Sequence, residues 1–62
     1  SPNEYINKIK LEKAKKMLKE KTYSIKIIAY SLGYENPMYF STVFKKNTGL
    51  SPSEYRRSSD DR

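Results

Sequence analysis

The chain has 62 residues, a net charge of +6 at pH 7, and neither cysteine nor histidine. This length allows one small domain, and the missing residue types remove the thiolate nucleophile, the usual general base and the commonest neutral metal ligand. We therefore expect neither an enzyme nor a cofactor, while the charge favours a polyanionic partner such as DNA or RNA. No apolar run approaches the roughly 20 residues of a membrane span, so no membrane partner is expected.

The first feature in chain order is a repeated phrase. Residues 1–5 read Ser-Pro-Asn-Glu-Tyr, and residues 51–55 read Ser-Pro-Ser-Glu-Tyr. A repeat at such a spacing is typical of a supersecondary unit that is used more than once. We expect residues 1–5 to be the tail of a first helical unit, and the chain to be a fragment that holds one whole unit after it.

Residues 2–20 are predicted to form one long helix, so that residues 1–21 make a linker between two units. One of its apolar faces holds Leu11, Ala14 and Leu18. A second apolar group points away from that face and consists of Tyr5, Ile6 and Ile9. With the first unit missing, we expect this second group to form an exposed apolar patch through which the chain self-associates.

Residues 22–57 are predicted to form the complete unit. Ser24 caps a short helix over 25–32, Gly33 permits a sharp turn, and Asn36 caps a helix that runs to about residue 47. Two helices joined by such a turn are typical of a helix-turn-helix, whose second helix lies in the DNA major groove. An ordinary pair of helices in a small bundle has the same pattern, and here the positive charge favours DNA binding.

The end of the chain is predicted to be a short helix followed by a disordered tail. Leu50 is expected to be buried, Ser51 opens the last helix, and residues 58–62 have no apolar side chain to bury. No strand pattern occurs. The predicted fold class is therefore all-α: a small helical domain with a long linker helix, a helix-turn-helix and a short C-terminal helix.

The outward face of the helix at 36–47 contains the candidate site. Once the apolar residues Phe40, Val43 and Phe44 are placed inward, this face is small, neutral and mixed, with cations only at its end. Serine and threonine can hydrogen-bond base edges, and methionine can contact a thymine methyl group. Lysines at the end of the helix can reach phosphates. Met38 has a second interpretation, as a surface residue that packs on Tyr34.

Residues 24–56, which read SIKIIAYSLGYENPMYFSTVFKKNTGLSPSEYR, closely resemble the second helix-turn-helix of AraC-type transcription regulators. The signature region of that family falls on residues 37–55. Residues 2–18, with Glu12-Lys13-Ala14, are similar to its linker helix. The resemblance implies a seven-helix DNA-binding domain with two helix-turn-helix units, whose recognition helices enter successive major grooves on one face of the duplex.

The resemblance also implies roles for individual residues. The base-facing positions would be Pro37, Met38, Ser41 and Thr42. The positions near the DNA backbone would be Asn36, Tyr39, Lys45 and Lys46, and we add Ser24, Lys26 and Arg56 to this group. Two departures stand out, because many members of the family have arginine in place of Thr42 and glutamate in place of Ile27.

The function predicted from these features is sequence-specific binding of double-stranded DNA in transcription regulation. For the full-length regulator the resemblance implies RNA polymerase as a further partner, transcription activation and a cytoplasmic location. The alternative is a helical protein-interaction module without DNA readout, which would dock through its two-sided long helix. Salt-dependent binding to duplex DNA separates the two hypotheses.

Overall fold

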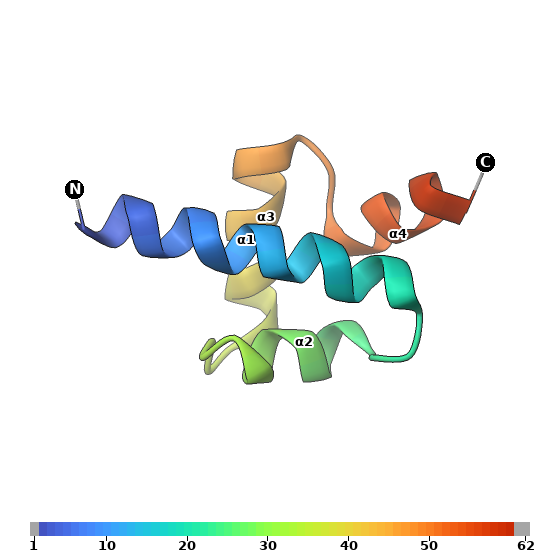
Figure 1. Cartoon of the computed structure of the whole chain (residues 1–62), viewed down its shortest axis with the longest axis horizontal. Helices are drawn as coiled ribbons and strands as arrows, with labels where there is room; N and C mark the ends of the chain where they lie inside the picture. Colours follow the sequence, from blue (N-terminus) through green and yellow to red (C-terminus); the bar gives the residue numbers. More distant parts are fainter. Residues whose placement is uncertain (1, 61–62) are drawn as a thin grey trace.

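The computed structural model describes residues 2–60, with the side chains of residues 5–59. In this part of the chain it has four helices and no strand: α1 (Pro2–Glu20), α2 (Ile25–Ser31), α3 (Pro37–Thr48) and α4 (Pro52–Asp60). Figure 1 shows α1 as the longest element, with α2 below it, α4 above its C-terminal end, and α3 crossing behind its middle. The predicted all-α class and the order of the helices are confirmed.

The helices begin at the capping residues that the sequence indicates. The Ser24 hydroxyl accepts a hydrogen bond of 3.1 Å from the Ile27 amide at the start of α2. The Asn36 side-chain oxygen accepts one of 2.8 Å from the Met38 amide at the start of α3. Each bond satisfies a donor that the first turn of a helix leaves without a partner.

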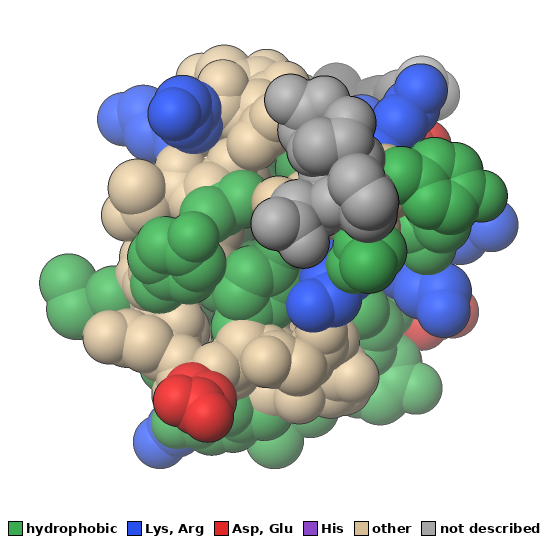
Figure 2. All heavy atoms as spheres, turned by 90° about the vertical axis from the view of Figure 1, so that its left-hand side faces the viewer, with side chains coloured by type: hydrophobic (Ala, Val, Ile, Leu, Met, Phe, Trp, Pro, Cys, Tyr) green, Lys and Arg blue, Asp and Glu red, His purple; other side chains and the backbone are tan. Residues whose placement is uncertain are grey.

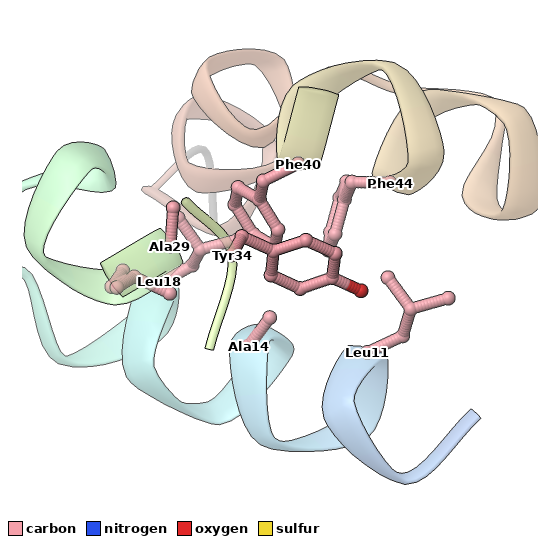
Figure 3. Close-up of a cluster of buried hydrophobic side chains, with 8 residues drawn as sticks. Leu11, Ala14, Leu18, Ala29, Tyr34, Phe40 and Phe44 are labelled. Carbon is pink, nitrogen blue, oxygen red and sulfur yellow. The ribbon is translucent and has the colours of Figure 1, made fainter. Parts of the chain in front are cut away.

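The core consists of buried side chains from α1, α2, α3 and the turn before α3: Leu11, Ala14, Leu18, Ile28, Ala29, Tyr34, Phe40 and Phe44. A row of aromatic rings runs through it. The ring centroids of Tyr34 and Phe40 are 5.2 Å apart, those of Phe40 and Phe44 are 5.9 Å apart, and those of Phe44 and Tyr55 are 5.5 Å apart. This row ties α3 to α4 and to the turn, as Figure 3 shows for Tyr34, Phe40 and Phe44.

Two predictions at the C-terminal end are wrong. Leu50 was predicted to be buried, yet 37% of its surface is exposed, because α4 packs through Pro52 and Tyr55 instead. The last helix was predicted to end at residue 57 before a tail, yet α4 continues through Ser58 and Ser59 to Asp60. Residues 61 and 62 of the predicted tail, and Ser1 at the start of the repeated phrase, lie outside the described residues.

The N-terminal half of α1 carries the predicted apolar patch. Tyr5 is 68% exposed, Ile6 is 47% exposed and Ile9 is 40% exposed. Figure 2, which views the molecule from this end, shows hydrophobic side chains gathered on the surface there. The expected exposure of these three residues is therefore confirmed. No described helix is both long enough and apolar enough to cross a membrane.

Candidate nucleic-acid interface

The turn between α2 and α3 fixes the direction of the second helix. Gly33 has a φ of 94°, in a region that L side chains rarely adopt. Its amide donates to the Tyr30 carbonyl and the Tyr34 amide donates to the Ala29 carbonyl, each at 3.0 Å. A Cβ atom at Gly33 would meet only the Lys10 Nζ, at an ordinary 3.6 Å, so the backbone and not space requires glycine.

Tyr34 holds the turn against the long helix. Its ring lies between Leu11 and Ala14 of α1 and the two phenylalanines of α3 (Figure 3). The Lys10 ammonium lies 5.1 Å from the ring centroid, within the range of a cation–π contact. Burial, and then the neighbouring Tyr39, raise the pKa of the Tyr34 hydroxyl, which is buried and has no hydrogen-bond partner among the described residues. Tyr34 is therefore a neutral side chain with a structural role. The sequence predicts its place in the turn but not its place in the core.

α3 is two-faced. Phe40 and Phe44 are fully buried on its inner face. Met38 and Thr42 lie about 200° around the helix from Phe40, because each is two residues from it. Both are exposed, and Met38 is 77% exposed. The structure thus brings these two predicted base-facing residues onto one outer face, one helical turn apart.

The other predicted base-facing residues, Pro37 and Ser41, are half-buried at the margin of this face. Met38 has the high exposure of a surface residue, which both of its interpretations require. The α3 side chain with a ring contact to Tyr34 at the margin of this face is Tyr39, whose ring centroid lies 6.1 Å from that of Tyr34.

The predicted backbone-contacting residues fall into two groups. Lys26 on α2, together with Lys45 and Lys46 in the last turn of α3, is exposed and cationic. Ser24, Asn36 and Tyr39 are exposed and uncharged, and the first two already serve as helix caps. The first turns of α2 and α3 carry no acidic residue, so no side chain there neutralises the positive helix ends.

Arg56 differs from these residues, because its side chain also makes hydrogen bonds within the domain. Its Nε donates a 2.9 Å hydrogen bond to the Leu18 carbonyl near the end of α1, and its Nη2 donates to the Tyr23 carbonyl. The guanidinium therefore fastens α4 to the end of α1. No local pattern in the sequence predicts this contact, because its partners lie 38 and 33 residues away.

Glu54 is a structural residue of α4 that sequence reasoning overlooked. The Ser51 amide donates to its carboxylate at 2.9 Å, and the Ser51 hydroxyl accepts from the Glu54 amide at 3.2 Å. These reciprocal bonds form a capping box, and the hydrogen bonds from Ser51 are the main reason that the pKa of Glu54 is lowered. The signal was present in the repeated phrase, where serine precedes glutamate by three residues.

A short helix, a glycine turn and a capped second helix with an acid-free outer face define a helix-turn-helix domain of the DNA-binding class. Among the described residues no cluster of acidic side chains could hold a metal ion. Comparison with known proteins agrees with this class: the family model described as "Helix-turn-helix domain" matches residues 1–58.

The chain is also similar to curated transcription regulators. It is 47% identical over 55 residues to the HTH-type transcriptional regulator YijO of Escherichia coli, covering 89% of this chain and 19% of that protein. It is 47% identical over 57 residues to the transcriptional regulatory protein YesN of Bacillus subtilis, covering 89% and 16%. It is 37% identical over 60 residues to the HTH-type transcriptional activator RhaS of Escherichia fergusonii, covering 97% and 22%.

The chain belongs to the AraC-type family of helix-turn-helix transcription regulators, in which this kind of domain binds DNA. It spans about a fifth of the length of these curated relatives. No solved structure matches it.

Proposed function

We propose that this domain reads DNA by placing α3 in the major groove, as part of a transcription regulator. The two-faced character of α3 carries the proposal. Phe40 and Phe44 on its inner face are fully buried in the core. Its outer face has no acidic residue and ends in Lys45 and Lys46. A helix that faces only water has no physical reason to lack acidic residues. A helix that lies beside DNA does, because the phosphates repel acidic side chains.

The exposure of the side chains supports a division of roles along α3. Met38 and Thr42, which lie on the outer face, would meet base edges, with Pro37 and Ser41 at the margin of the contact. The three exposed lysines Lys26, Lys45 and Lys46 would neutralise phosphates. The uncharged Ser24, Asn36 and Tyr39 would position the helix ends against the backbone. Arg56 is left out of this set, because two of its guanidinium nitrogens, Nε and Nη2, already donate to backbone carbonyls of the domain.

The salt dependence of duplex binding tests the proposal. Three neutralised phosphates predict that log K falls with log salt at a slope of about −2.7. We would titrate a labelled 20-base-pair duplex by fluorescence anisotropy between 50 and 300 mM salt. Lys45→Gln with Lys46→Gln should make the slope shallower by about 1.8. The matched control also replaces two lysines with glutamine, at Lys13 and Lys16, which are exposed on α1. Equal effects of the two double variants, or no binding at 50 mM salt, would contradict the proposal.

The full-length regulator would also contact RNA polymerase and act in the cytoplasm. The support is the relatives' description as transcription regulators and, for RhaS, as an activator. A pull-down of purified polymerase by full-length regulator bound to its operator tests the first point, and absence of polymerase from the complex would refute it.

The exposed patch of Tyr5, Ile6 and Ile9 supports self-association of this chain at high concentration. Sedimentation should show the wild type heavier than the variant that carries Ile6→Lys and Ile9→Lys. A wild type that stays monomeric at high concentration would show that the patch does not bind a second copy. Self-association that is salt-independent, in a chain without DNA binding, would favour the protein-interaction alternative.

A further inference from the structure

The hydroxyl of Thr42 is already used inside α3. It donates a hydrogen bond of 3.1 Å to the Met38 carbonyl, one turn earlier in the helix. A threonine hydroxyl has one proton to donate, so this bond leaves Thr42 without a donor for a base acceptor. The group that Thr42 can still bring to a base edge without breaking this bond is its methyl group, together with the acceptor side of the oxygen.

Met38 lies beside it. Residues at i and i+4 of a helix are surface neighbours, and Met38 is the most exposed of the large apolar side chains on α3. The two positions therefore present an apolar pair: a flexible thioether side chain and a methyl group. The first cation on this helix, Lys45, comes three residues after Thr42. No donor suited to the acceptors of guanine lies at the pair itself.

In the major groove only one base presents an apolar group, which is the C5-methyl of thymine. We propose that Met38 and Thr42 recognise thymine methyl groups, so that the DNA preferred by this domain has thymines where the pair meets the groove. This inference rests on the proposed function, because it requires α3 to enter the major groove. It goes further by naming the base feature that the outer face of α3 selects.

Replacing thymine with uracil tests the proposal, because the two bases differ only by the methyl group. The probes are two self-complementary 20-base-pair duplexes of alternating deoxyadenosine with thymidine and of alternating deoxyadenosine with deoxyuridine. Both have the same phosphates and the same hydrogen-bonding groups in the groove. We expect the wild-type chain to bind the thymine duplex about fourfold more tightly for each methyl group that becomes buried.

Two variants of Thr42 separate the methyl group from the hydroxyl. Thr42→Ser keeps the hydroxyl and removes the methyl, so the thymine-to-uracil affinity ratio should fall toward one. Thr42→Val keeps a methyl group in the same place and removes the hydroxyl, so the ratio should stay near that of the wild type. Met38→Gln should lower the ratio as well. Thr42 and Met38 are exposed, so all three variants should fold, and circular dichroism checks this.

A wild-type ratio of one, with salt-dependent binding intact, would overturn the thymine readout and leave the proposed function standing. A ratio that survives Thr42→Ser but is lost in Thr42→Val would also overturn it, because the hydroxyl would then be the reading group. Absence of salt-dependent binding to either duplex would instead overturn the proposed function, and the thymine readout with it.

Discussion

Replacing Phe44 with alanine tests whether the aromatic row holds α3 in place. Phe44 is fully buried and lies between Phe40 and Tyr55, with ring centroids 5.9 and 5.5 Å from its own. Truncating a buried phenylalanine to alanine costs about 3–5 kcal/mol. A domain of 62 residues has a free energy of unfolding of about 3–9 kcal/mol. The variant should therefore lose between a third and all of its stability.

Thermal unfolding followed by circular dichroism measures this loss. Each kcal/mol corresponds to about 4–8 °C in Tm for a domain of this size, so Phe44→Ala should lower Tm by at least about 12 °C. The control is Met38→Ala on the same helix, where the side chain is exposed and the change should stay within about 0.5 kcal/mol. A Tm of Phe44→Ala within a few degrees of the wild type would show that α3 does not depend on this row.

Three further substitutions test individual contacts. Glu54→Gln keeps a cap on α4 but does not titrate. The pKa of Glu54 is lowered in the folded chain, so the Glu54 carboxylate stabilises the fold at neutral pH. This stabilisation is lost as the pH falls through that lowered pKa. The Tm advantage of the wild type over Glu54→Gln should therefore shrink on acidification, and a constant difference would contradict the capping-box account. Arg56→Ala should cost about 1–3 kcal/mol and leave the salt slope of DNA binding unchanged, whereas a shallower slope without loss of Tm would restore Arg56 to the phosphate contacts. Gly33→Ala should cost about 1–3 kcal/mol through backbone strain, and an unchanged Tm would show that the turn can relax.

The features that the sequence predicted well are those with local causes. The bounds of α2 and α3 follow from local residues. Ser24 and Asn36 cap the starts of the two helices, and Gly33 and Gly49 follow their ends. The inward placement of Phe40 and Phe44 follows from helical spacing alone. For the same reason, helical spacing alone predicts which residues of α3 face outward.

The features that the sequence did not predict depend on contacts between distant segments. An arginine such as Arg56 is expected at the surface, yet its Nε and Nη2 donate to carbonyls more than 30 residues away in the sequence. Leu50 is apolar, yet the packing of α4 leaves it at the surface. Tyr34 reads as a turn residue, although α1 and α3 close over its ring. No periodic or short-range pattern in the sequence predicts these three placements.

The central claim is that α3 is the surface that meets DNA, and a nuclear magnetic resonance titration tests it most directly. A ¹⁵N-labelled chain would be titrated with a short duplex at low salt, and shifts of the backbone amides would be mapped on the structure. We predict that the largest shifts fall on α3 and on the first turn of α2, with the amides near Tyr5 and Ile9 unaffected. Shifts concentrated on the N-terminal half of α1, with α3 unchanged, would contradict the account.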